Sequence, residues 1–135
     1  AYEVQYCDWS SDVCSSDLPI DRDTVARIFG TILDEQYLYE NPFERAVFLH
    51  CNIARLQPFH DGNKRTARTL ESTVLMSSNI VPVYSSRPED TLKYREAIID
   101  FYETENYEKY INFFLDKQIE RLNAMSRPEE QFHSK

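Results

Sequence analysis

The segment Gln57–Arg68 holds the residues of this chain best suited to phosphate chemistry, and it reads Gln-Pro-Phe-His-Asp-Gly-Asn-Lys-Arg-Thr-Ala-Arg. The pattern predicts a turn that opens a helix near Asn63, and a helix start offers unpaired backbone N–H groups and the positive end of the helix dipole. Lys64, Arg65 and Arg68 fall in the first turns, where that dipole disfavours cations. A bound polyanion would offset these charges, so the segment predicts a nucleotide-phosphate site.

Single residues in this segment suggest separate roles. Gly62 is one of only two glycines in the chain and lets the backbone approach a phosphate closely. Asp61 could hold Mg²⁺, which usually takes one or two carboxylates plus substrate phosphates. Arg65 and Arg68 share a helix face, and guanidinium groups suit phosphate oxygens. Plainer readings stay open: Asp61 could cap the helix, and the cations could form a solvated helix face.

The order of these residues resembles the signature of the Fic/Doc (Fido) family, His-x-Phe-x-Asp/Glu-Gly-Asn-Gly/Lys-Arg-x-x-Arg. The matching positions are Phe59, Asp61, Gly62, Asn63, Lys64, Arg65 and Arg68. The resemblance implies a Fic-like protein that binds ATP and Mg²⁺ and transfers AMP to Ser, Thr or Tyr hydroxyls of an unidentified protein target. It assigns Asp61 to the metal and Phe59 to a core anchor of the loop, and it assigns the nucleotide to Gly62, Asn63, Lys64, Arg65 and Arg68.

One position departs from that signature, because Gln57 stands where the family has its general-base His. A glutamine amide accepts no proton at neutral pH, and a general base contributes about a hundred- to ten-thousand-fold to rate. We therefore expect an impaired transferase, a nucleotide-binding pseudoenzyme or regulatory binding module, or an error in the sequence at this codon. His60 and His50 are not expected to replace the base, since the family places the first away from the nucleotide and the second in the core.

Lys64 leaves the type of transfer open. Family members with Gly at this position usually transfer AMP, whereas the Doc-type toxins carry Lys and transfer the γ-phosphate. Many bacterial Fic proteins also have Lys, and Gly62, Asn63 and Arg68 resemble Fic more than Doc. AMP transfer is therefore favoured, with a Doc-like phosphotransferase as the alternative.

Composition narrows the class of protein. The chain has 135 residues and a net charge of −8, which fits one soluble domain and argues against general nucleic-acid binding. It shows no apolar run long enough for a membrane span and no signal-peptide pattern. Its three cysteines lack the spacing of metal ligands, so a reducing bacterial cytoplasm is the expected location.

The beginning of the chain reads as a foreign segment. Residues 8–18 resemble one reading frame of a sequencing-library adapter, and they have no helical or strand period. The alternative is a natural Ser/Asp linker. We interpret residues 1–18 as non-native, residues 19–125 as an N-terminally truncated Fido core, and residues 126–135 as a flexible tail. The family's target-registering flap would fall before Pro19.

From Pro19 onward the hydrophobic period is helical, which predicts an all-α bundle of about five to six helices. The resemblance implies that this bundle has the Fic fold. Asn41 and Pro42 predict a helix start, and that helix continues to about Leu56. Further helices are predicted from Asn63 to about Ser77, from about Pro88, and over a broad apolar stripe from Tyr107 to Leu122. Residues 80–84 are predicted to be an extended connector.

Overall fold

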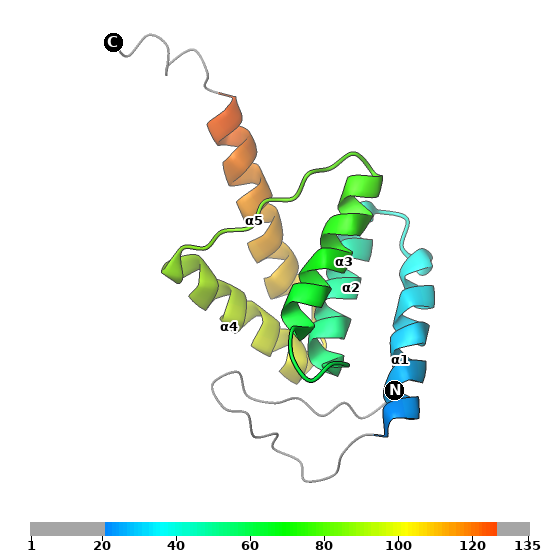
Figure 1. Cartoon of the computed structure of the whole chain (residues 1–135). Helices are drawn as coiled ribbons and strands as arrows, with labels where there is room; N and C mark the ends of the chain where they lie inside the picture. The colour runs from blue at the N-terminus through cyan, green and yellow to red at the C-terminus, as the bar shows by residue number, and fades with distance from the viewer. Residues whose placement is uncertain (1–20, 127–135) are drawn as a thin grey trace, which may run out of the picture. The chain divides into compact units, whose positions relative to one another are not determined.

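The computed structural model describes residues 21–126, which form five α-helices and one 3-10 helix with no strand among them (Figure 1). The all-α prediction is therefore confirmed. The chain divides into two compact units at Ile80 and Val81, and the predicted core, residues 19–125, contributes to both. The predicted foreign segment 1–18 lies outside the described residues, as does the predicted tail after residue 126. No helix of the described part is both long and apolar enough to cross a membrane.

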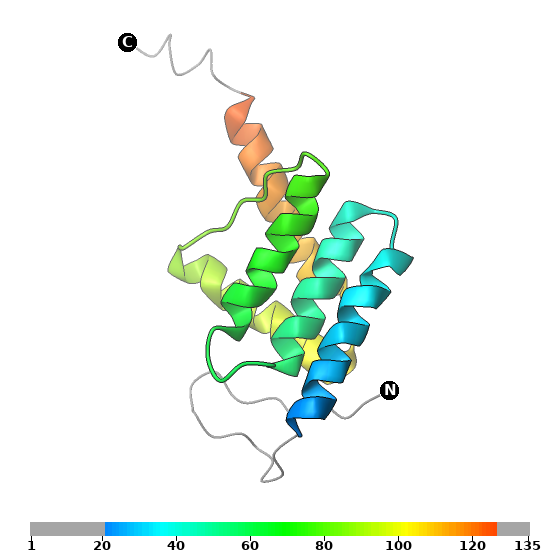
Figure 2. The ribbon, with the colours of Figure 1, turned by 45° about the vertical axis from the view of Figure 1, so that its right-hand side comes forward.

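The first unit contains α1 (Arg22–Glu35), the 3-10 helix η1 (Gln36–Leu38), α2 (Pro42–Leu56) and α3 (Asn63–Ser77). Helix α2 lies between α1 and α3 (Figure 2) and contacts both. It is buried almost all round its circumference, which is typical of a core helix. Its start matches the prediction, because the Asn41 side chain accepts a hydrogen bond from the Phe43 N–H at 2.8 Å and Pro42 follows the cap.

The second unit consists of an extended connector followed by α4 (Pro88–Thr104) and α5 (Glu108–Met125), which pack on each other. Buried Gln118 of α5 holds the connector: its Oε1 accepts the Val83 N–H at 2.8 Å, and its Nε2 donates to the Val83 carbonyl at 3.1 Å. The Val83 N–H and carbonyl thus pair with a side chain and not with a neighbouring strand. Residues 80–84 form an extended connector, as predicted.

The predicted apolar stripe of α5 is buried only in its first half. Tyr110 and Phe114 are buried, whereas Ile119 and Leu122 are 53% and 64% exposed, which corrects the prediction for these two residues. Hydrophobic periodicity identifies the apolar face of a helix, but it does not tell how far along that face the packing extends.

A buried carboxylate joins the connector, α4 and α5 within this unit. Asp90 is 2% exposed and accepts hydrogen bonds from Arg87 Nε at 2.8 Å and Ser85 Oγ at 2.5 Å, while Lys117 Nζ lies 2.6 Å from its other oxygen. The Lys117 and Ser85 hydrogen bonds hold the pKa of Asp90 well below its usual range, and Arg87 adds to this effect. The carboxylate is thus ionised and fully partnered.

We expect Asp90→Asn to lower the urea midpoint of unfolding at pH 7, because the variant keeps the shape and removes the charge. A carboxylate with a lowered folded-state pKa adds stability above its unfolded pKa of about 3.9 and loses it as the pH falls. The gap between wild type and variant should therefore narrow from pH 7 to pH 3 in urea titrations followed by circular dichroism.

The matched control is Asp100→Asn on the same helix, whose carboxylate makes a more exposed pair with Lys109 at 3.4 Å. Such pairs contribute little to stability. Equal losses in the two variants, or a gap that does not change with pH, would contradict the assignment.

Candidate nucleotide-phosphate site

The motif forms the turn between α2 and α3, and both ends of this turn are left-handed. Gln57 ends α2 with φ 50° and ψ 60°, and Gly62 precedes α3 with φ 79°. A Cβ at Gly62 would lie 3.3 Å from Arg65 Nη2, so a side chain there would be both strained and crowded. Because the N-cap of α3 is glycine, it brings no side-chain oxygen to the first-turn N–H groups.

Asn63 closes this turn with its side chain. Its Oδ1 accepts the Phe59 N–H at 2.8 Å, and its Nδ2 donates to the Phe59 carbonyl at 2.8 Å. Both ends of the amide are therefore used within the loop, so Asn63 shapes the turn. A direct contact between Asn63 and a phosphate stays a prediction.

Asp61 and Arg65 carry the charges closest to the turn, and both side chains reach solvent. Asp61 Oδ1 accepts the Gly62 N–H at 2.7 Å, so this oxygen stabilises the turn, and Asp61 does not occupy the N-cap position itself. Its Oδ2 lies 3.5 Å from Arg65 Nη2, with Asp61 90% and Arg65 80% exposed. An exposed pair of this kind is weak, so a cation and an anion could displace each partner from the other.

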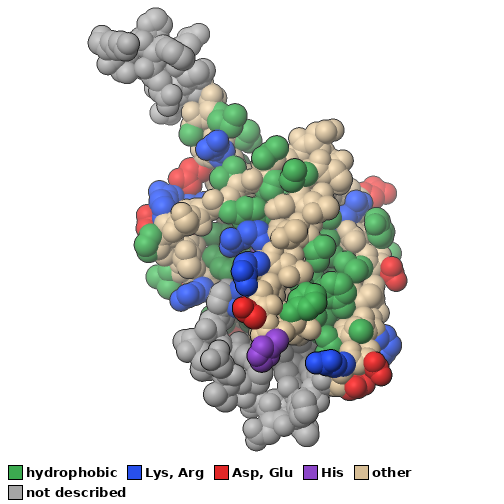
Figure 3. Space-filling view, in the orientation of Figure 1, with side chains coloured by type: hydrophobic (Ala, Val, Ile, Leu, Met, Phe, Trp, Pro, Cys, Tyr) green, Lys and Arg blue, Asp and Glu red, His purple; other side chains and the backbone are tan. Residues whose placement is uncertain are grey.

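The three cations of the motif lie on the first turns of α3, as predicted. Arg65 and Arg68 are exposed and Lys64 is half-buried. Figure 3 shows basic, acidic and histidine side chains gathered around the lower end of this helix. The described residues hold no cluster of three metal-ligating side chains. A Mg²⁺ ion at Asp61 would therefore take most of its ligands from water and from the phosphates of the nucleotide.

The two histidines of the described part differ sharply in exposure. His60 is exposed in the loop, whereas His50 of α2 is 1% exposed and its Nδ1 lies 3.5 Å from Oε1 of fully buried Glu71. Burial, followed by the charges of Arg68 and Lys64, lowers the pKa of His50 to about 3. These effects outweigh the attraction of Glu71 for a proton. His50 is thus a neutral core residue, as predicted.

Glu71 is fully buried, and no role was predicted for it from the sequence. Glutamate on a helix usually faces solvent, so its type gave no sign of burial. The signal was its position three residues after Arg68, on the same helix face. Buried Cys51 lies near the same charge, because burial and Glu71 raise the pKa of its thiol. The thiol is therefore protonated and unreactive.

Phe59 was expected to be a core anchor, and the structure corrects this expectation. Its ring is 49% exposed and meets Phe29 of α1 edge-on, with 6.2 Å between ring centroids. The backbone of residue 59 is tied to Asn63, so its side chain stays at the rim of the turn. Phe59 therefore links the loop to the surface of α1.

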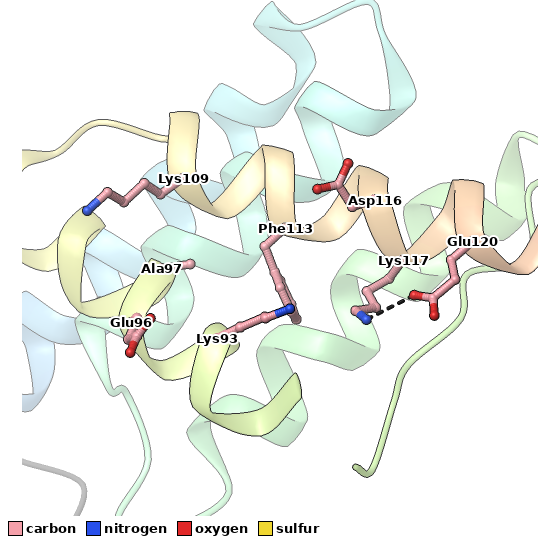
Figure 4. Close-up of a pocket in the computed structure, with 8 residues that line it drawn as sticks. All are labelled: Lys93, Glu96, Ala97, Lys109, Phe113, Asp116, Lys117 and Glu120. Carbon is pink, nitrogen blue, oxygen red and sulfur yellow. Dashed lines mark hydrogen bonds and ion pairs between the residues drawn. The ribbon is translucent and has the colours of Figure 1, made fainter. Parts of the chain in front are cut away.

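A separate cavity of about 420 Å³ lies between α4 and α5 (Figure 4) and contains no motif residue. Three lysines and three carboxylates line it together with Ala97 and Phe113. Lys117 is bound to Asp90 and Glu120, and Lys109 pairs with Asp100. The lining charges thus cancel, and two of its three lysines already have partners, so the cavity has no preference for a phosphate. The motif remains the candidate site.

Comparison with known proteins bears on this turn directly. Residues 16–75, which include the whole turn and most of α3, match the model of the Fic/DOC family. The match covers less than half of the chain, so it concerns this segment. The recognition made from the motif is thereby confirmed, while the assignment of Gln57 to the position of the family His stays a prediction.

Several Fic relatives show local similarity to the chain. Protein adenylyltransferase fic-1 of Caenorhabditis elegans is 44% identical over 50 residues, which are 37% of this chain and 10% of that protein. Protein adenylyltransferase Fic of Culex quinquefasciatus is 36% identical over 59 residues, 44% of this chain and 12% of that protein. The Nematostella vectensis protein of the same name is 33% identical over 72 residues, 53% and 14% of the two chains.

The chain therefore spans about a tenth of the length of the first relatives that it matches. No solved structure matches it. The similarity thus concerns the Fic segment, and the all-α structure is consistent with the Fic fold.

The lowered pKa of His50 predicts a pH dependence of stability. In the unfolded chain a histidine takes up a proton below about pH 6.5, whereas folded His50 stays neutral down to about pH 3. The unfolded state then binds more protons, so the free energy of unfolding should fall with decreasing pH by up to about 1.4 kcal/mol per unit.

Urea titrations of wild type and His50→Gln between pH 7 and pH 5 measure this slope. The variant lacks the titrating imidazole and should be flatter over this range. Exposed His60→Gln is the matched control and should keep the wild-type slope. A wild-type slope in His50→Gln would refute the assignment.

Proposed function

We propose that this Fic segment binds ATP with Mg²⁺ at the turn 57–62 and the start of α3, in the manner of a protein AMP transferase with an impaired base. The observation that carries the proposal is the α3 N-terminus, which has glycine as its N-cap and Asp61 and Arg65 exposed beside it. The relatives named protein adenylyltransferases support ATP as the nucleotide and a protein as the acceptor.

Different groups of the turn and of α3 would bind the phosphates and the metal. First-turn N–H groups, Arg65 and Arg68 would hold phosphate oxygens, and the positive end of the helix dipole favours the same charge. Asp61 would hold Mg²⁺, which when bound offsets part of the phosphate charge. Asp61 and Arg65, now 3.5 Å apart, would exchange their weak mutual pairing for the metal and for phosphate oxygens, respectively.

Gln57 limits the chemistry that this site could perform. In AMP transfer the target hydroxyl oxygen attacks the α-phosphorus, the bond to the β-phosphate oxygen breaks, and pyrophosphate leaves. The hydroxyl proton needs an acceptor, and neither Gln57 nor buried His50 supplies one at neutral pH. This observation favours a second candidate function, a nucleotide-binding module that performs little transfer.

The backbone of Gln57 would accept the family base without rebuilding the turn. Its φ of 50° is left-handed, and His and Asn adopt this conformation more readily than most residues with a side chain. Restoring histidine should therefore test chemistry and leave the fold intact.

Binding is tested by calorimetry with ATP and MgCl₂. We expect Arg65→Ala to weaken affinity at least about tenfold, since charge-assisted hydrogen bonds contribute about 1.5–3 kcal/mol. Arg27→Ala, an exposed arginine on α1, is the matched control and should bind as wild type does. If folded wild-type protein takes up no nucleotide, the proposal fails.

Chemistry is tested with ATP labelled at the α- or γ-phosphate. Wild type should transfer near background, whereas Gln57→His should label protein from α-labelled ATP about a hundredfold faster or more. Gln57→Asn is the control, because it suits the same backbone conformation and brings no base. Labelling from γ-labelled ATP alone would instead favour the Doc-like phosphotransfer that Lys64 suggests. Efficient transfer by wild type would contradict the impairment.

A further inference from the structure

A buried acid–imidazole pair lies behind the motif, and we propose that it positions the cations of the phosphate site. Glu71 of α3 and His50 of α2 are 0% and 1% exposed, with 3.5 Å between the Glu71 carboxylate oxygen and His50 Nδ1. Neither residue belongs to the turn, and neither would touch the nucleotide. The proposal rests on the proposed nucleotide binding and adds a positioning role for Glu71.

The spacing along α3 places this carboxylate in line with two of the three motif cations. Lys64, Arg68 and Glu71 lie at positions i, i+4 and i+7, which form one face of a helix. That face turns toward α2, because Glu71 contacts His50 and because Lys64 and Arg68 both act on the charge state of the same imidazole. Arg65 lies off this face and points across the turn to Asp61.

The energetics of burial explain why the cations would be held. A carboxylate removed from water must find opposite charge or hydrogen-bond donors. From α2, His50 and Cys51 lie close to Glu71, and neither the neutral imidazole nor the protonated thiol carries positive charge. Lys64 and Arg68 supply that charge from α3. Lys64 on this face is half-buried, as such an attraction would require, whereas Arg68 one turn further is exposed, so its guanidinium could reach both the carboxylate and a phosphate.

Cations held in this way would be pre-organised for the phosphates. A lysine or arginine that is already ordered loses less conformational freedom when it binds an anion. The neutral imidazole lies beside the carboxylate and does not compete with the cations for its charge. Glu71 is thus a positioning residue, and it acts through Arg68 and Lys64.

The test is Glu71→Gln, which keeps size and shape and removes the charge. We expect the affinity for ADP with MgCl₂, measured by calorimetry at low and high salt, to fall about tenfold, as it does when an outer-shell partner of a binding group is lost. In an Arg68→Gln background, Glu71→Gln should weaken binding much less than it does in wild type, because the two changes then remove one shared interaction.

A purely structural role for Glu71 is tested with Leu75→Ala. Leu75 is fully buried one turn further along the same helix, so its truncation destabilises α3 without changing any charge. Folded Leu75→Ala should bind ADP with wild-type affinity. If Glu71→Gln also binds ADP as wild type does, or more tightly, the positioning role is refuted.

A readout without nucleotide separates this inference from the proposed function. The Nε–H order of Arg68, measured by ¹⁵N relaxation, should fall in Glu71→Gln, while that of Arg65 should stay unchanged. If wild type binds no ADP, the proposed function fails, and this measurement still decides the positioning. Equal Arg68 order in wild type and variant would overturn it.

Discussion

The packing of α2 against α3 is the constraint on which the candidate site depends. α2 is buried around most of its surface, and its contact with α3 is the most extensive between any two described helices. This packing fixes where α2 ends and α3 begins, so the turn between them has only six residues, 57–62, to reverse the chain. The reversal uses left-handed backbone at both ends of the turn, which glycine adopts freely at position 62 and which costs energy at Gln57.

The two units use charge in opposite ways. In the second unit the Asp90 carboxylate is buried and bound by Arg87, Lys117 and Ser85, which leaves it no capacity for a ligand. In the first unit Asp61 and Arg65 are exposed and share only one long contact. Water already solvates these two side chains, so their weak pairing is easily exchanged for phosphate and metal. The contrast separates charges that stabilise the fold from charges that can bind a ligand.

Residues 16–75 match the Fic/DOC family, and the role proposed for Gln57 separates nucleotide binding from group transfer. The groups proposed to hold phosphate are backbone N–H groups and arginines of α3, and none of them depends on the residue at position 57. The proton acceptor does depend on it. Nucleotide binding and group transfer can therefore be tested independently in this chain.

Much of the fold followed from the sequence, because helix signals are local. Asn41 and Pro42 fixed the start of α2, hydrophobic period and turn residues marked the other helices, and the order of motif residues identified the family. The expectation that His50 is buried was also correct, since the residue lies on the apolar face that Ala46 and Ile53 define.

Tertiary structure decided which side chains are buried, because burial requires a neighbouring element that packs over them. Phe59 and Leu122 have side chains typical of a core, yet both are exposed. The type of a residue sets its preference for burial, but it does not supply a neighbouring element to cover it. Glu71 shows the opposite case, a charged residue made fully buried by the helix packed over it. Sequence alone predicted the helices and the motif, whereas packing determined which charged side chains are exposed and which are buried, since burial depends on residues distant in the chain.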